Sequence, residues 1–317
     1  MGLATKDCGV GTDYEVVPAN RPALRQGRPV TLKMPDGALI AGEWRCDTAT
    51  PKAVVCLSHA MMVDRRTLDS PPGAGLLTAL LAAGLQVFWF DQRGHGQSQG
   101  TVWDYDKLVG DAARVAAYVS SVQPGLPQVA VGHSLFAHVA LAWQAVSMDF
   151  PAARRFDGLV LLAGNVWHPA FEPLWWRLAV KRLVFSGLVA VAKPFGRLPA
   201  VRFSLGTADE PLPYLQQMNS WMTGQDYADR QGHSYRQKLR RVNVPILSVS
   251  GAADRLLAVP ACQLRFVSET AGPITHWQVG RRFGDAVDPD HMGLVLSNKL
   301  SPVFHDVAAW IATPGRF

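Results

Sequence analysis

Short apolar runs along the chain alternate with longer stretches in which hydrophobic residues recur every three or four positions. The short runs are typical of strands buried on both faces of a sheet, and the wider spacing is typical of helices with one buried side. This pattern predicts strands at 53–57, 86–90, 128–131, 158–162, 244–249 and 275–279. It predicts helices at 75–83, 104–122 and 135–146. The order strand, helix, strand favours the fold class α/β, with a mostly parallel central sheet flanked by helices.

The first part of the chain does not follow this alternation. Residues 1–27 are polar and interrupted by proline and glycine, which predicts an irregular N-terminal arm. The turn sequence Pro35-Asp36-Gly37 then separates two β-rich runs, 29–34 and 38–45. A Pro-Asp-Gly turn between such runs predicts a β-hairpin.

A second departure lies between residues 165 and 241. This segment holds no clear strand, but it holds four tryptophans and six prolines. We expect a helical cap inserted between the two parts of the core, 28–164 and 242–317. A separate small domain is the alternative, but the segment has no flanking linkers.

Composition and charge narrow the function classes. The 317 residues suit one large α/β domain or a core with an insertion. The longest apolar stretch, Leu183 to Ala192, has ten residues, whereas a bilayer span needs roughly 20. The first thirty residues hold no apolar leader, so we expect a cytoplasmic protein without an integral membrane segment. The net charge of +6 comes without a nucleic-acid-binding motif, so we expect no nucleic acid partner.

The four cysteines form no Cys-x-x-Cys pair, and their spacing matches no zinc module. In a reducing compartment they are expected to be free thiols. They are Cys8, Cys46, Cys56 and Cys262.

The strongest chemical signal is the sequence Gly132-His133-Ser134-Leu135-Phe136, between a predicted strand and a predicted helix. A serine on such a sharp turn points its hydroxyl out of the sheet, above a helix N-terminus. Ser134 is therefore the candidate nucleophile. Taken alone, it is equally explained as a helix N-cap.

A serine nucleophile needs a base, and the base needs an orienting acid. Asp254 follows the strand predicted at 244–249, and His291 lies in a polar loop after the last predicted strand. Each alone is also explained as a turn or surface residue. Ser134, Asp254 and His291 nevertheless follow strand ends in the order expected on this kind of sheet, which predicts a Ser-His-Asp triad.

The loop after the first buried strand is expected to supply an oxyanion donor, the backbone N–H of Met61, beside that of Leu135. His59, in the same loop, is expected to hold it by hydrogen bonds. The run at 91–98 is rich in glycine, but no P-loop lysine and no Gly-x-Gly-x-x-Gly follow it, which disfavours a phosphate cradle.

These motifs together resemble the α/β-hydrolase-fold serine hydrolases. The resemblance covers about residues 28–312 and rests on His59-Ala60-Met61, the Asp-x-Arg-Gly-x-Gly-x-Ser run at 91–98, the serine elbow, Gly251-x-x-Asp254 and Asp290-His291. The segment after Gly164 resembles that of bacterial hydrolases near the monoacylglycerol-lipase-like group. The resemblance implies a carboxylester hydrolase or a related thioesterase, amidase or acyltransferase. It implies no cofactor and no metal.

Three residues depart from the family pattern. Ala60 and Phe136 stand where the family usually has glycine, and Ala137 replaces a second glycine that is common there. A large side chain in a packed region typically costs ~1–3 kcal/mol unless its neighbours are small. Phe136 is therefore expected either to crowd the helix or to narrow the acyl pocket.

The cap suggests a hydrophobic acyl substrate, because Trp175, Trp176 and Trp221 could line a pocket with Phe136. Burial of the cap against the core explains these tryptophans equally well. Basic residues in the cap suggest an anionic lipid surface, a CoA-linked donor or an acyl-carrier partner, or only a solvated face. Three functions remain open: ester or thioester hydrolysis, acyl transfer by the same triad, and non-catalytic ligand binding.

Overall fold

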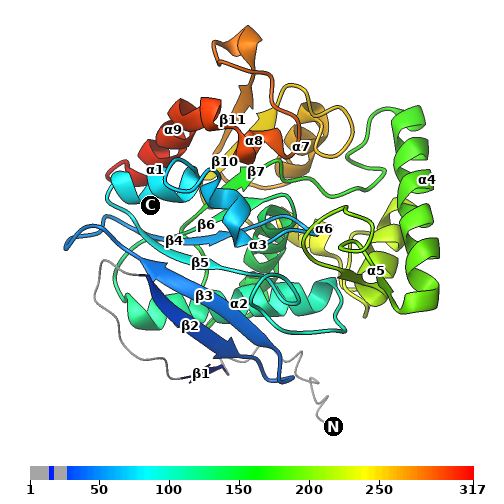
Figure 1. Cartoon of the computed structure of the whole chain (residues 1–317), viewed down its shortest axis with the longest axis horizontal. Coiled ribbons are helices and arrows are strands. Elements are labelled where there is room, and N and C mark those ends of the chain that lie inside the picture. Colours follow the sequence, from blue (N-terminus) through cyan, green and yellow to red (C-terminus); the bar gives the residue numbers. More distant parts are fainter. Residues whose placement is uncertain (1–13, 18–26) are drawn as a thin grey trace.

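The computed structural model describes residues 14–17 and 27–317. Within these residues, a nine-stranded sheet runs through the centre in the order β1-β2-β3-β5-β4-β6-β7-β10-β11 (Figure 1). Its strands are β1 (Glu15–Val17), β2 (Arg28–Lys33), β3 (Leu39–Arg45), β4 (Val54–Ser58), β5 (Gln86–Phe90), β6 (Gln128–His133), β7 (Gly158–Leu162), β10 (Ile246–Gly251) and β11 (Ile274–Val279).

The longer helices of the core are α1 (Leu76–Ala82), α2 (Tyr105–Val122), α3 (Leu135–Val146), α7 (Pro260–Val267) and α9 (Ser301–Ala312), with the short α8 (Gly293–Leu296). One hydrophobic cluster joins α2 and α3 to one face of the sheet. A second joins α1 and α9 to the other face. The result is a three-layered α/β domain, and the predicted fold class is confirmed.

Six neighbouring strands of this sheet are parallel: β5, β4, β6, β7, β10 and β11. The pairs β1–β2, β2–β3 and β3–β5 are antiparallel. Every residue of β4, β6 and β7 is buried, because helices cover both faces there. β2 and β3 form the predicted hairpin. The alternating burial of β3 shows that this edge has one face toward solvent.

One expectation for the N-terminal arm is wrong. Glu15–Val17 forms β1, which pairs antiparallel with β2 rather than being irregular. Three residues are too short a run to carry a recognisable hydrophobic period, so the pairing partner decides the structure. The rest of the predicted arm, including Cys8, lies outside the described residues.

The segment between β7 and β10 contains α4 (Trp175–Ala192), α5 (Leu212–Met222) and α6 (Tyr235–Leu239). It also contains two strands that the sequence did not predict, β8 (Arg197–Leu198) and β9 (Glu210–Pro211), which pair antiparallel. α4 and α5 lie at one side of the sheet in Figure 1. We refer to residues 165–241 as the cap.

Candidate active site

Ser134 connects β6 to α3 in a strained backbone conformation, with φ 51° and ψ −102°. The backbone of the following helix passes so close that a Cβ on Gly132 would lie 2.3 Å from the N atom of Ala137. Glycine at 132 therefore permits the sharp turn. Ser134 makes no side-chain capping bond to α3, so its hydroxyl is not used as an N-cap.

His291 lies within hydrogen-bond distance of this serine. The Ser134 hydroxyl donates to Nε2 of His291 over 2.9 Å, in the tautomer that carries its proton on Nδ1. The loop that carries His291 packs on the end of β10, where a Cβ on Gly251 would lie 2.4 Å from the carbonyl oxygen of Pro289. That oxygen also accepts from the Ala253 N–H at 3.0 Å. The absence of a side chain at 251 thus lets the loop approach.

Asp254 completes the chain of contacts. Nδ1 of His291 donates to Oδ2 of Asp254 over 2.8 Å, and the amides of Leu257 and Ala258 each donate to the carboxylate at 2.9 Å. Burial acts to raise the pKa of Asp254, but the hydrogen bond and charge of His291 and the two amides outweigh it. The pKa therefore lies below its ordinary value, and the carboxylate stays ionised.

His133, which the sequence analysis did not single out, holds the other side of His291. Its Nε2 donates to the carbonyl oxygen of His291 over 3.0 Å, and the two rings lie 5.1 Å apart. Burial lowers the pKa of His133 to about 3, so this imidazole is neutral and donates one proton. Its place inside the elbow motif was the available signal.

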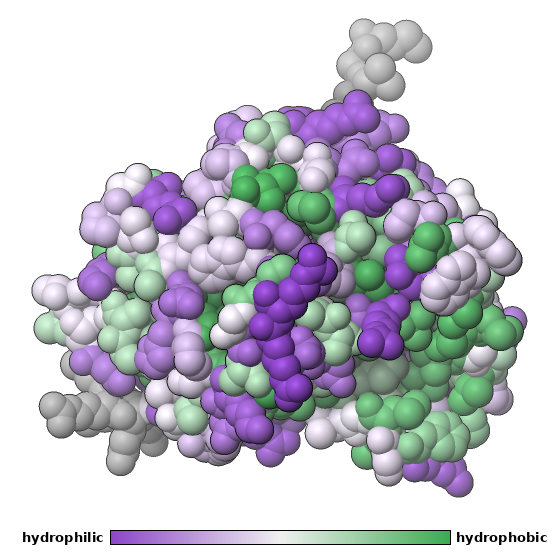
Figure 2. All heavy atoms as spheres, turned by 90° about the horizontal axis from the view of Figure 1, so that it is seen from above, coloured by the Kyte–Doolittle hydropathy of each residue, from purple (hydrophilic) through white to green (hydrophobic). Residues whose placement is uncertain are grey.

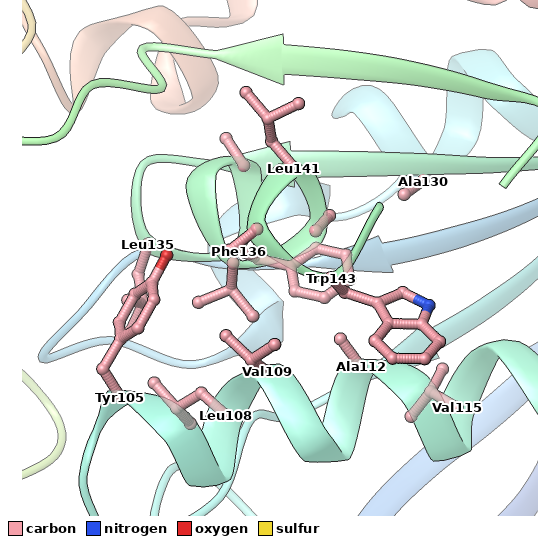
Figure 3. Packing of buried hydrophobic residues seen from close by; sticks show 14 of the residues in the cluster. Tyr105, Leu108, Val109, Ala112, Val115, Ala130, Leu135, Phe136, Leu141 and Trp143 are labelled. Atoms are coloured by element: carbon pink, nitrogen blue, oxygen red, sulfur yellow. The ribbon is translucent and has the colours of Figure 1, made fainter. Parts of the chain in front are cut away.

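Phe136 does not enter a pocket. Its side chain is 1% exposed and packs edge-to-face against Phe90, with ring centres 5.1 Å apart. Figure 3 shows it between α3 and α2, beside Val109. Phe136 is thus core packing, which corrects its prediction as a pocket residue. Ala137 is accommodated because its Cβ faces Gly164, where an added Cβ would lie only 2.7 Å away.

The two expected oxyanion donors lie on the loop after β4 and at the start of α3. Leu135 is the first residue of α3, so its N–H has no acceptor within the helix. Among the described residues, neither this amide nor that of Met61 has a hydrogen-bond partner. The start of α3 is hydrogen-bonded directly to the loop after β4, because the Phe136 N–H donates to the His59 carbonyl at 3.3 Å.

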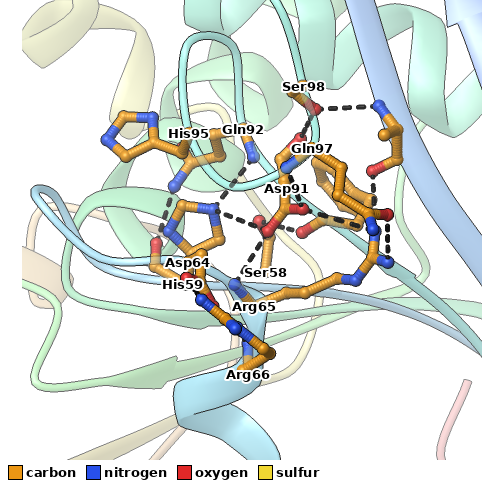
Figure 4. Close-up of polar contacts among 12 residues, drawn as sticks. Ser58, His59, Asp64, Arg65, Arg66, Asp91, Gln92, His95, Gln97 and Ser98 are labelled. Carbon is orange, nitrogen blue, oxygen red and sulfur yellow. Dashed lines mark hydrogen bonds and ion pairs between the residues drawn. The ribbon is translucent and has the colours of Figure 1, made fainter. Parts of the chain in front are cut away.

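His59 is buried and uses both ring nitrogens to hold this loop. Nδ1 donates to the carbonyl of Ala60 over 2.7 Å, and Nε2 accepts from the amide of Gln92 at 3.0 Å. The Gln92 side chain donates back to the His59 carbonyl at 2.7 Å (Figure 4). Burial lowers the pKa of His59 well below its ordinary value, so the ring is neutral. Its location agrees with the expected structural role.

The three candidate pocket tryptophans do not gather at one place. Trp221 is buried, packs against Tyr105 and Tyr227, and donates its indole proton to the Ala228 carbonyl. Trp175 is 81% exposed and Trp176 is 50% exposed. The structure thus corrects the expectation of a shared pocket wall, because packing of the cap accounts for Trp221.

Trp175 and Trp176 belong to an apolar outer face of α4. The exposed positions of this helix carry no charge; they are Trp175, Trp176, Ala179, Val180, Leu183, Val184, Ser186, Gly187, Ala190 and Val191. Two of its three charges lie inside instead, where Arg177 and Lys181 pair with the buried Glu172 at 2.7 and 2.9 Å, and the third, Arg182, is half-buried. Figure 2 shows hydrophobic side chains gathered on the side of the molecule where α4 lies in Figure 1.

Glu210 is a buried acid next to the site that the sequence analysis missed. It comes from β9 in the cap, yet its Oε1 accepts from the Met62 amide at 2.5 Å and contacts Nε2 of His95 at 3.0 Å. No local motif marks this glutamate. Its partners are 148 and 115 residues away in the chain.

The chain is similar in sequence to known proteins. A family model described as serine aminopeptidase, S33 matches residues 49–273. The chain belongs to this family of α/β hydrolases. Among curated relatives, this chain is 25% identical to the monoacylglycerol lipase of Mycolicibacterium smegmatis over 290 residues, which is 85% of this chain and 91% of that protein. It is 32% identical to human monoglyceride lipase over 134 residues, or 40% of each chain.

Solved structures support the same fold. The structure is similar to that of DcsB in complex with its substrate analogue, with a TM-score of 0.63 and 15% sequence identity. The match covers 90% of this chain and 99% of that one. The structure also matches the esterase EaEST of Exiguobacterium antarcticum with a TM-score of 0.61 and 14% identity, covering 89% and 99%. The protein has the α/β-hydrolase fold and is an enzyme of the serine esterase type. None of the helices among the described residues is long and apolar enough to cross a bilayer.

Proposed function

We propose that the protein hydrolyses a carboxylic ester or thioester with a hydrophobic acyl group, with Ser134 as the nucleophile. The observation that supports this most directly is the chain of hydrogen bonds from Ser134 through His291 to Asp254, at a strained strand-to-helix turn. The similarity to monoacylglycerol and monoglyceride lipases supports a lipid-like acyl group. The ordered roles of nucleophile, base and orienting acid are those required for acyl transfer.

In the proposed first half-reaction, Oγ of Ser134 forms a bond to the acyl carbon while its proton moves to Nε2 of His291. The carbonyl oxygen becomes an oxyanion that accepts from the Met61 and Leu135 amides. The bond to the leaving alcohol or thiol then breaks, and the leaving group takes the proton from His291. An acyl ester of Ser134 remains.

Water resolves this acyl-enzyme by the reverse roles. It attacks the acyl carbon and gives a proton to His291, and the Ser134 oxygen leaves and recovers that proton. Asp254 accepts the Nδ1–H bond throughout and stabilises the imidazolium form. The carboxylic acid is released and the enzyme is unchanged.

The test compares Ser134→Ala with Ser268→Ala, an exposed serine at the end of α7. We expect Ser134→Ala to lower kcat for a p-nitrophenyl ester by on the order of 10⁵-fold or more, because triad members act as a unit. Ser268→Ala should keep the wild-type rate. Undiminished turnover by Ser134→Ala would overturn the proposal.

A further inference from the structure

The loop that carries the candidate oxyanion donor is held from the cap as well as from the core. Met62, the residue after that donor, has a left-handed backbone with φ 61°. Its carbonyl accepts from the amides of Thr207 at 2.7 Å and Ala208 at 3.1 Å, and its own amide donates to Glu210. We call Thr207, Ala208 and Glu210 the cap clamp. All hydrogen bonds that the structure gives to the Met62 backbone come from it.

The clamp approaches the loop closely. An added Cβ at Gly206 would lie 2.1 Å from the carbonyl oxygen of Met62. A non-glycine residue there would have to displace the loop or the cap. A left-handed conformation at a methionine is strained and persists only where its surroundings impose it. Here the cap clamp imposes it, so the orientation of the neighbouring Met61 amide depends on the cap.

The carboxylate of the clamp is paired with a histidine of the core. Nδ1 of His95 lies 2.8 Å from the carbonyl oxygen of Arg93, which can only accept, so Nδ1 carries a proton. Nε2 lies 3.0 Å from Oε1 of Glu210. Because Oε1 accepts from the Met62 amide, a proton on Nε2 of His95 makes both neighbours of this oxygen donors. Both side chains are fully buried, so the contact is shielded from bulk solvent.

Other groups around the pair fit this charge state. The neutral ring of His59 lies 5.1 Å from that of His95 on the core side. Asp91, from the loop after β5, adds negative charge near His95, and Tyr214 of α5 lies near Glu210 on the cap side. Burial acts to lower the pKa of His95, but Glu210, the Arg93 carbonyl and Asp91 outweigh it and leave the pKa raised.

We propose that Glu210 is a positioning residue for the oxyanion loop: with its partner His95 protonated, it fixes Met62 and thereby aims the Met61 amide at the reacting carbonyl. This deepens the proposed function and rests on it. Glu210 does not touch the reacting atoms, so its effect reaches the substrate only through the Met61 amide. Attachment of the cap and assembly of the oxyanion hole are then one event.

The pairing of His95 with Glu210 makes the clamp sensitive to pH. A histidine with a raised pKa contributes its ion pair fully below its ordinary pKa of 6.5, and the contribution disappears as the pH rises through the raised value. Glu210 then faces an acceptor nitrogen in a dry environment, and the clamp loosens. We expect kcat to fall at alkaline pH for this reason.

The experiment compares Glu210→Gln with Asp209→Asn. Asp209 is the preceding residue, and its carboxylate pairs with Arg197 away from the loop. Loss of an oxyanion donor costs ~10²–10³ in rate. Misdirecting one should cost less, so we expect kcat of Glu210→Gln to fall about 10- to 100-fold with KM within about twofold. A trifluoromethyl ketone forms a tetrahedral adduct that resembles the transition state. Its affinity for Glu210→Gln should fall by the same factor as kcat/KM. The alkaline fall in kcat should vanish in Glu210→Gln and persist in Asp209→Asn.

A merely structural role for Glu210 would lower the melting temperature while leaving kcat, the pH profile and inhibitor affinity of the folded variant at wild-type values, and that result overturns the proposal. Should Glu210→Gln not fold, the wild-type protein still decides, because a kcat that stays flat as the pH rises from 6.5 until the protein unfolds contradicts the His95 requirement. Wild-type labelling of Ser134 by a fluorophosphonate is measured in parallel. If it is absent the proposed function fails, and if it is present only the clamp is at issue.

Discussion

At the scale of single residues, the backbone conformation and the hydrogen bond of Ser134 distinguish it from an ordinary helix-capping serine. Serine is common before helices as an N-cap. This serine instead has a positive φ, and its hydroxyl donates a hydrogen bond to His291. Strain of this kind costs of order 1–3 kcal/mol and is typical of functional sites. The strained backbone of Ser134 is therefore consistent with a catalytic role for this residue.

Asp254 provides a test of the orienting role. Asp254→Asn keeps the shape of the side chain but can present an N–H to Nδ1 of His291, which favours the wrong tautomer. We predict a fall in kcat on the order of 10⁴-fold, with the fold retained. Steady-state kinetics measure it, and circular dichroism checks the fold. A loss of less than about tenfold would show that Asp254 does not orient the base.

Phe136 provides a test of packing against pocket roles. Because the ring is buried against Phe90, Phe136→Ala should lower the free energy of unfolding by about 3–5 kcal/mol. KM for short and long p-nitrophenyl esters should stay unchanged. Urea unfolding and a chain-length series measure the two effects. A large change in chain-length preference at unchanged stability would place the ring in the pocket instead.

At the scale of elements, the sequence predicted most of the core because the buried strands are continuous apolar runs. β4, β5, β6 and β7 each lie within two residues of their expected bounds, and α2 begins one residue after its expected start, with Asp104 as its N-cap. The failures have physical causes. β1 and β8 exist only because a partner strand pairs with them, which no local period records.

α4 shows a second limit of sequence reasoning. Its tryptophans predicted an inward-facing apolar side, whereas the described helix buries Arg177 and Lys181 and exposes Trp175 and Leu183. Both cations pair with the buried Glu172, which lies just before the helix. The buried side of α4 thus combines two paired cations with the apolar Phe185, Val189 and Ala192, a mixture that the hydrophobic pattern alone does not predict.

This cluster predicts a large stability effect. Glu172→Gln leaves two buried cations without their counterion and should lower the free energy of unfolding by about 3–5 kcal/mol at neutral pH. Burial acts to raise the pKa of Glu172, but the hydrogen bonds and charges of Arg177 and Lys181 outweigh this effect. The pKa of Glu172 is lowered to about 2. The stabilisation is therefore present above the ordinary pKa of 4.5 and is lost as the pH falls toward about 2.

The matched control is Glu15→Gln, which breaks the exposed pair with Lys33 and should cost no more than about 1 kcal/mol. Urea unfolding of both variants at several pH values measures the difference. Equal effects of the two substitutions would show that the Glu172 cluster does not stabilise the cap.

At the scale of the whole molecule, the site is assembled from segments that are remote in sequence. The hydrogen bonds from His291 to Ser134 and to Asp254 span 157 and 37 residues, and the contact from the cap to Met62 spans 148. The first two were predictable, because the ends of parallel strands meet at one edge of a sheet. The contact of Glu210 was not, because nothing in the sequence fixes how the cap lies on the core.

The central claim is that Ser134 is an activated nucleophile. The most direct measurement is treatment of the intact protein with a fluorophosphonate, followed by peptide mass mapping of wild type, Ser134→Ala and Asp254→Asn. We expect one adduct on the wild-type protein, located at Ser134, and no adduct on Ser134→Ala. Asp254→Asn should be labelled much more slowly than the wild type. An unlabelled wild-type protein, or an adduct on another residue that survives in Ser134→Ala, would contradict it.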